Sequence, residues 1–232
     1  MAKQSFGWPG GIHSDSIPIT CIGLSAGGLQ PLKTIFEYLS PHTGMAFVVV
    51  SHVSRTEPTS LPNLLSRWSR MPSELARCGM ILEANHIYII PPGQEILLDD
   101  GQLRVQPRSK QRGWSNVLTL FLDSMVNSPR MSADVAVILS GLGADGAAAL
   151  EGFHARGGIA IAQDPDSAEY EDMPRAAIAT GFVSSVLPPE DIAGKIEEIA
   201  KSSATESRPQ PHSPRHPVPR EAHRSPAPAK MA

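Results

Sequence analysis

The sequence predicts an α/β fold, a three-layer and doubly wound domain on a mostly parallel sheet, with an antiparallel hairpin added near one edge. Three observations predict it. Short apolar runs rich in β-branched residues recur along the chain, as expected of strands buried on both faces. Amphipathic helical patterns alternate with these runs. One stretch of closely spaced strand patterns and short turns interrupts the alternation.

Four apolar runs are expected to form the parallel strands, because each is short and is closed by small or turn-forming residues. They are residues 17–24, 46–50, 135–139 and 158–162. Helical periodicity marks the segments between them and the end of the domain. The expected helices cover residues 29–39, 116–126, 147–156 and 190–201.

The interrupting stretch lies between residues 86 and 106. Its strand patterns are His86–Ile90, Glu95–Leu98 and Leu103–Gln106, and the sequence Asp99-Asp100-Gly101 forms the tip of the last pair. A short polar turn with glycine between two strand patterns is typical of a hairpin. We therefore expect all three segments to form an antiparallel addition at an edge of the sheet.

Composition divides the 232 residues into a flexible leader (1–16), one domain (17–201) and a disordered tail (202–232). The tail holds seven of the 22 prolines and only two large apolar side chains, so it buries too little surface to offset its ordering entropy. It also holds five of the 20 basic residues but only two of the 23 acidic ones. The domain is therefore net acidic, which argues against a nucleic-acid partner.

The two cysteines, Cys21 and Cys78, lie far apart and match no metal-binding spacing. The N-terminal residues contain no apolar signal core. No apolar run approaches the roughly 20 residues that a membrane-spanning helix needs. These features predict a protein of the reducing cytoplasm, with no structural metal and no membrane insertion.

The first strand ends in Ile22-Gly23-Leu24-Ser25-Ala26-Gly27-Gly28, directly before a helical pattern. A serine at such a strand-to-helix turn is displayed at the carboxyl edge of the sheet, and the helix N-terminus favours developing negative charge. The flanking glycines permit a tight turn and a close approach by substrate. The alternative is a dinucleotide-binding loop, but serine stands where that loop needs its central glycine.

His52 and Asp145 follow two other strand patterns, in Val48-Val49-Val50-Ser51-His52 and in Leu139 to Gly146. Taken alone, His52 is more often a structural or solvated residue, and Asp145 is more often an N-cap for the helix that follows it. Together with Ser25 they supply a nucleophile, a base and a carboxylate from three strand ends. That set activates a serine for acyl transfer, with backbone amides near Ala26 or in Gly141–Gly143 as oxyanion donors. The chain order Ser, His, Asp excludes an α/β-hydrolase.

Five blocks in the same order resemble the catalytic domain of the chemotaxis methylesterase CheB. They are residues 22–28, 48–52, 86–92, 139–147, and 162–168 with Met173-Pro174-Arg175, within a similarity that runs from about Ile17 to Ala200. The residues of these blocks most resemble the stand-alone or hybrid-fusion version of the family, which lacks a receiver domain. The resemblance implies a cytoplasmic protein-glutamate methylesterase, also a glutamine deamidase in many members, that uses Ser25, His52 and Asp145 without a cofactor.

The implied partners are the methylated cytoplasmic helices of chemoreceptors and a separate response regulator. Two departures from the family bear on the site: Leu142 stands where Met or Thr is common, and Trp114 and Thr119 stand where a proline-containing stretch followed by Asp is common. The second departure predicts a different rim toward the substrate. A hydrolase of another ester or amide, and a non-catalytic interaction module with the same fold, are the alternative functions.

Overall fold

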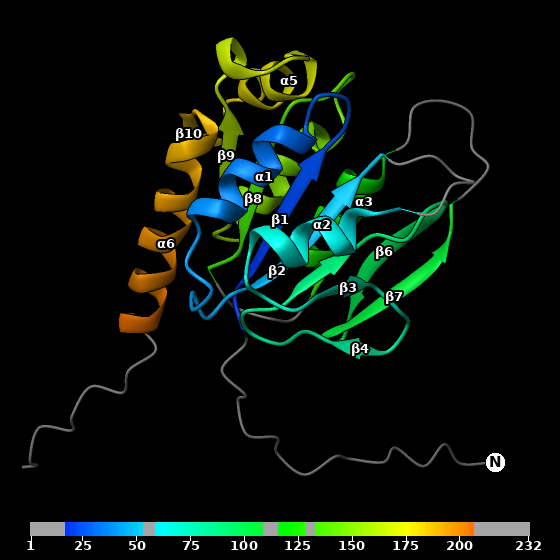
Figure 1. Ribbon diagram of the computed structural model, residues 1–232. Helices are drawn as coiled ribbons and strands as arrows, with labels where there is room; N and C mark the ends of the chain where they lie inside the picture. The colour runs from blue at the N-terminus through cyan, green and yellow to red at the C-terminus, as the bar shows by residue number, and fades with distance from the viewer. Residues whose placement is uncertain (1–16, 53–58, 109–115, 129–132, 207–232) are drawn as a thin grey trace, which may run out of the picture.

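The computed structural model describes residues 17–52, 59–108, 116–128 and 133–206 of the chain. Figure 1 shows the arrangement of its helices and strands, in which the five strands β3 to β7 follow one another between α2 and α3. In chain order the elements are β1 (Ile19–Leu24), α1 (Leu29–Tyr38), β2 (Ala46–Ser51), α2 (Leu61–Trp68), β3 (Ser73–Leu75), β4 (Met80–Ile81), β5 (Ile87–Ile89), β6 (Gln94–Asp99), β7 (Gln102–Pro107), α3 (Val117–Asn127), β8 (Val135–Ile138), the 3₁₀ turn η1 (Ala147–Ala149), α4 (Leu150–Ala155), β9 (Ile159–Gln163), the 3₁₀ turn η2 (Pro165–Ser167), α5 (Asp172–Ala179), β10 (Val183–Leu187) and α6 (Pro189–Glu206).

Seven strands form the main sheet in the order β10-β9-β8-β1-β2-β5-β3. Every pairing in it is parallel, which confirms the predicted parallel sheet. The four apolar runs predicted as strands are β1, β2, β8 and β9, and β1 lies between β8 and β2. All residues of these three central strands are buried, which explains why their sequences are apolar on both faces.

Helices cover both faces of this sheet, so the predicted three-layer arrangement is confirmed (Figure 1). Successive residues of β1 point to opposite faces, as the pleat requires. Ile22 packs in an apolar cluster with residues of α1, α2 and α6, whereas Cys21 packs in the other cluster with residues of α3 and α4. Loops follow the carboxyl ends of β8, β1 and β2.

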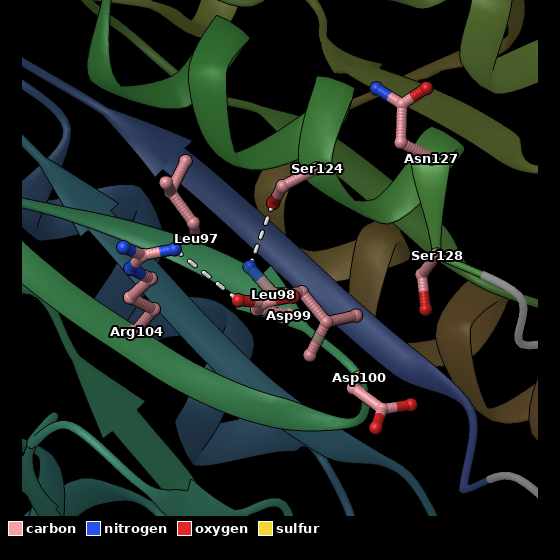
Figure 2. A pocket seen from close by; sticks show the side chains of 8 residues that line it. All are labelled: Leu97, Leu98, Asp99, Asp100, Arg104, Ser124, Asn127 and Ser128. Carbon is pink, nitrogen blue, oxygen red and sulfur yellow. Dashed lines mark hydrogen bonds and ion pairs between the residues drawn. The ribbon is translucent and has the colours of Figure 1, made fainter. Parts of the chain in front are cut away.

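The antiparallel part of the fold is a sheet of its own, in the order β4-β7-β6. Its β6–β7 hairpin pairs Leu98 with Leu103, so this predicted hairpin is confirmed. It is attached to α3, because the Leu98 amide donates a 2.8 Å hydrogen bond to Ser124 Oγ (Figure 2). The apolar residues Ile96, Leu98 and Leu103 are buried in the same cluster as α3.

The prediction that His86–Ile90 belongs to the antiparallel addition was wrong. This segment contains β5, which lies inside the main sheet in parallel pairings with β2 and β3. Its three residues are fully or almost fully buried, as those of a central strand are. The short turn after this segment suggested that it belonged with the next two strand patterns, but β5 and β6 lie in different sheets.

The final helix extends beyond the predicted domain boundary at residue 201, since α6 runs to Glu206. The predicted leader, residues 1–16, and the remainder of the predicted tail, residues 207–232, lie outside the described residues. Within the described part of the chain, no helix has both the length and the apolar character needed to cross a membrane.

Candidate functional site

Three adjacent strands, in the order β8-β1-β2, end at the candidate site. Ser25 directly follows β1, His52 directly follows β2, and Asp145 lies in the loop after β8. Parallel strands present their carboxyl ends at one edge of the sheet, so these residues lie at the same edge. Backbone hydrogen bonds tie the strand ends together: Ser25 N donates to Ser140 O at 3.0 Å, and His52 N donates to Leu24 O at 3.3 Å.

His52 and Asp145 are in direct contact although 93 positions separate them in the sequence. The distance from His52 Nε2 to Asp145 Oδ2 is 2.7 Å, and the two side chains are 14% and 3% exposed. A carboxylate accepts hydrogen bonds and does not donate them, so the proton in this contact lies on Nε2. The other ring nitrogen, Nδ1, is therefore the one that can accept a proton.

The Asp145 carboxylate also closes the N-terminus of α3. Its Oδ2 accepts a 2.9 Å hydrogen bond from the Leu118 amide, and its Oδ1 accepts one of 2.9 Å from the Thr119 amide and one of 2.8 Å from Thr119 Oγ1. The alternative that Asp145 caps the helix following it is wrong, since neither η1 nor α4 receives a side-chain cap. Asp145 instead caps a helix that precedes it in the chain.

These contacts keep Asp145 ionised. Burial acts to raise the pKa of Asp145, but hydrogen bonds from His52, from the amides of Thr119 and Leu118 and from the Thr119 hydroxyl outweigh burial and lower the pKa below its ordinary value. The helix N-terminus adds favourable positive potential to the carboxylate. An ionised, buried carboxylate in contact with His52 can orient the imidazole and stabilise its protonated form.

Ser25 and His52 line one cavity of about 440 Å³. Its wall combines polar groups with apolar side chains, among them Leu29 and Leu61. Asp145 does not line this cavity and meets it only through its contact with His52. Within the described residues Ser25 Oγ makes no hydrogen bond to His52, and such contacts are often long before substrate binds.

Ser140 joins the Ser25 loop to the segment that follows η2. Its side chain is fully buried, and its Oγ donates to Ala26 O at 2.9 Å and accepts from Tyr170 N at 3.0 Å. Its own amide donates to the buried Gln163 Oε1 at 2.8 Å. The backbone at Ser25 is therefore held from a neighbouring loop by a hydroxyl whose role the sequence did not indicate.

Two glycines make room for α3 at this site. A Cβ atom on Gly23 would lie 2.0 Å from Leu118 Cδ2, and one on Gly146 would lie 2.6 Å from the same atom. Gly146 also has a φ of 92°, which side-chain-bearing residues rarely adopt. Gly23 was expected to admit substrate; in the structure it admits Leu118, whose amide reaches Asp145.

The structure bears on two expectations, one about the residues at the rim that meets substrate and one about the oxyanion donors. Thr119 was expected to contribute to the surface that meets substrate, but its side chain contacts Asp145 and does not line the Ser25 cavity; Trp114 lies outside the described residues. Of the candidate oxyanion donors, the Gly141 amide already donates to Tyr170 O at 3.0 Å. The other candidate, Ala26, directly follows Ser25 and lines the same cavity.

A second histidine–carboxylate contact in the described residues, from His86 Nε2 to Glu74 Oε1 at 3.2 Å, is more exposed and does not line the Ser25 cavity. Burial raises the pKa of the Cys21 thiol well above its ordinary value, so this thiol stays protonated. No group of three or more His, Cys, Asp or Glu side chains in the described ranges is placed to hold a metal ion. A second cavity, of about 410 Å³, lies between the β6–β7 tip and α3, and its Asp99 is paired with Arg104 at 3.4 Å (Figure 2).

Known proteins resemble this chain over most of its described length. The sequence model of a family described as CheB methylesterase matches residues 20–196. Protein-glutamate methylesterase/protein-glutamine glutaminase 4 of Burkholderia thailandensis is 30% identical over 192 residues, which make up 82% of this chain and 56% of that protein. An uncharacterized 104.1 kDa protein of Rhodobacter capsulatus is 40% identical over 135 residues, 57% of this chain and 14% of that protein.

A comparison with solved structures also finds a CheB methylesterase domain. The crystal structure of the Thermotoga maritima CheB methylesterase catalytic domain superposes with a TM-score of 0.71 at 28% identity, covering 78% of this chain and 98% of that one. This chain spans about half the length of the B. thailandensis methylesterase that it matches.

Proposed function

This chain belongs to the CheB methylesterase family, and from that premise we propose that it is a serine hydrolase that removes methyl esters from glutamate side chains of chemoreceptors. In this proposal Ser25 is the nucleophile, His52 the general base and Asp145 the residue that orients His52. The relative from B. thailandensis is named for a glutaminase activity as well, and the same residues would serve deamidation of glutamine. Because the proposed substrate is a cytoplasmic segment of a receptor, we propose that the reaction takes place in the cytoplasm.

The mechanism follows from the site geometry. His52 Nδ1 takes the proton of Ser25 Oγ as this oxygen bonds to the ester carbonyl carbon. The tetrahedral intermediate collapses, the bond to the methoxy oxygen breaks, and the imidazolium returns the proton so that methanol leaves. Water then attacks the acyl-enzyme with His52 again as base, which releases the glutamate carboxylate and restores Ser25. Asp145 stabilises the imidazolium in both steps.

The observation that carries the proposal is the 2.7 Å contact between His52 and Asp145 beside Ser25, at the ends of three adjacent strands. Capping α3 would not by itself require Asp145 to contact His52, so this contact favours a hydrolase over a module that only binds a partner. Asp145 and His52 are in contact before any substrate binds. Charged groups that are arranged in advance in this way lower a reaction barrier.

Methanol release from a methyl-labelled chemoreceptor cytoplasmic fragment tests this function. We expect turnover by the unaltered protein, and a loss of about 10⁴-fold or more in Ser25→Ala and in His52→Gln. Ser66→Ala is the matched control, because Ser66 is an exposed serine of α2 that bonds only to Asn63 O and does not line the cavity.

A serine-reactive phosphonate provides a second readout that needs no receptor. Labelling at Ser25 that disappears in His52→Gln supports the assignment of nucleophile and base. Turnover of small esters without methanol release from the receptor would move the assignment to another ester substrate. Absence of both turnover and labelling would remove the hydrolase function.

A further inference from the structure

The Thr119 hydroxyl bonds to two consecutive residues of the loop after β8, Asp145 and Gly146. Its Oγ1 lies 2.8 Å from Asp145 Oδ1 and 2.8 Å from the Gly146 amide nitrogen. Thr119 is half-buried at the start of α3, and its side chain does not line the cavity that contains Ser25 and His52. It therefore meets the site only through the Asp145 loop.

The chemistry of these neighbours fixes the direction of both hydrogen bonds. The Gly146 amide can only donate, so Thr119 Oγ1 accepts there. The ionised Asp145 carboxylate can only accept, so the single hydroxyl proton of Thr119 points at Oδ1. This hydroxyl has one arrangement that satisfies both partners.

The orientation of the carboxylate matters because rotation about its Cβ–Cγ bond is soft. Partners at the two oxygens decide where the carboxylate plane lies. Oδ1 is held by the Thr119 amide and hydroxyl, and Oδ2 receives His52 Nε2 at 2.7 Å. Fixing Oδ1 therefore fixes Oδ2, and with it the direction in which the imidazole presents Nδ1.

We propose that Thr119 is a positioning residue, whose hydroxyl sets the plane of the Asp145 carboxylate and thereby the orientation of His52. The inference rests on the proposed hydrolase function, in which His52 is the base. It assigns a purpose to the departure from the family pattern at Thr119, which the sequence linked to the substrate rim. Thr119 does not touch the reacting atoms in this assignment.

The test uses two substitutions at one position. Thr119→Val keeps the shape of the side chain but removes the hydroxyl, and Thr119→Ser keeps the hydroxyl but removes the methyl group. We expect Thr119→Val to lower kcat for methyl ester hydrolysis about 10- to 100-fold, the range for losing one hydrogen bond to a charged group, with KM nearly unchanged. Thr119→Ser should keep kcat within about threefold of the unaltered protein, a difference of less than about 1 kcal/mol.

The matched control is Ser124→Ala on the same helix. Ser124 Oγ bonds to Leu98 N and Phe121 O and not to the Asp145 loop, so this variant also loses a hydroxyl with two partners. Thermal unfolding of the three variants separates loss of stability from loss of kcat. A fall in kcat for Ser124→Ala equal to that for Thr119→Val would overturn the positioning role.

A spectroscopic readout makes the inference independent of turnover. In protein labelled with ¹⁵N-histidine, the proton on His52 Nε2 should resonate downfield, with its assignment checked in His52→Gln. Thr119→Val should shift or broaden this resonance, and Thr119→Ser should retain it. If the resonance responds but no ester is turned over, the proposed function fails and the positioning role stands.

An unchanged resonance and an unchanged kcat in Thr119→Val would overturn the positioning role while leaving the hydrolase function intact. If Thr119→Val does not fold, Thr119→Ser still decides the matter. A loss of kcat in Thr119→Ser of 10-fold or more would show that the methyl group, and not the hydroxyl, is what the site needs.

Discussion

Two cavities in the described part of the molecule are nearly equal in volume, at about 440 Å³ beside Ser25 and about 410 Å³ beside the β6–β7 hairpin. Each is lined by a nitrogen-containing side chain that contacts a carboxylate: His52 at the first and Arg104 at the second. At the first, Asp145 is 3% exposed and contacts His52 at 2.7 Å; at the second, Asp99 is 64% exposed and contacts Arg104 at 3.4 Å. Volume therefore does not distinguish the two.

What distinguishes them is how firmly the charged groups are held. Asp145 accepts hydrogen bonds from three residues, two of which belong to a helix N-terminus. An exposed pair such as Asp99–Arg104 contributes at most about 1 kcal/mol and is screened by salt. A candidate active site is therefore better identified by charged groups that are buried and held in place than by the volume of a cavity.

Removing the charge from each carboxylate should separate the two cavities most widely. Asp145→Asn is expected to lower kcat by about 10⁴-fold, because the amide favours the wrong imidazole tautomer while it preserves shape. Asp99→Asn should leave kcat within about twofold, because Asp99 is exposed and lies at the other cavity. Kinetics of methyl ester hydrolysis measure both, and comparable losses would erase the distinction drawn above.

Glycine substitutions near the two cavities should have smaller effects than the carboxylate substitutions, but should also differ from each other. In Gly23→Ala the new methyl group meets Leu118 at the α3 N-terminus, so we expect a loss of about 1–3 kcal/mol in unfolding free energy together with lower kcat. In Gly101→Ala, at the hairpin tip, the φ of 76° costs about 1–2 kcal/mol, but kcat should not change. Urea denaturation and kinetics on both variants separate a general loss of stability from a disturbed site.

The pH dependence of stability should have opposite signs at two carboxylates of this region. The folded pKa of Asp145 is lowered, so its contribution to stability is present above the unfolded pKa of about 4 and is lost as pH falls through the folded pKa. Burial raises the pKa of Asp123 on α3, so ionised Asp123 weakens the fold at neutral pH.

Urea denaturation at pH 7 and pH 3 checks this pair. Asp145→Asn should be less stable than the unaltered protein at pH 7, and the gap should narrow at pH 3. Asp123→Asn should be slightly more stable at pH 7 and lose that advantage at pH 3. A gap for Asp145→Asn that widens as pH falls would contradict the assignment of a stabilised carboxylate.

The central strands could be predicted from the sequence because burial on both faces leaves a local signature. Runs such as Ala46–Val50 contain only apolar residues, and this determined β1, β2, β8 and β9. β10 left no such signature, since its residues at the sheet edge alternate between partly buried and exposed. β5 was assigned to the wrong sheet because its neighbours, β2 and β3, are not adjacent to it in the sequence.

The site shows the same limit. Ser25, His52 and Asp145 each end a recognisable strand pattern, so their gathering at one edge followed from the parallel sheet. Thr119 lies 26 positions from Asp145, and the helical pattern around it gives no sign of that contact. Ser140 is 114 positions from Ala26, and its buried hydroxyl is indistinguishable in sequence from any other loop serine.

The double use of Asp145 has a consequence for how the protein matures. The carboxylate that completes the first turn of α3 is the one that contacts His52, and the two contacts join segments that lie 27 and 93 positions apart in the chain. A chain in which Asp145 has not reached the α3 N-terminus lacks the carboxylate contact that orients His52. In the proposed hydrolase, such a partly folded chain should therefore not attack esters.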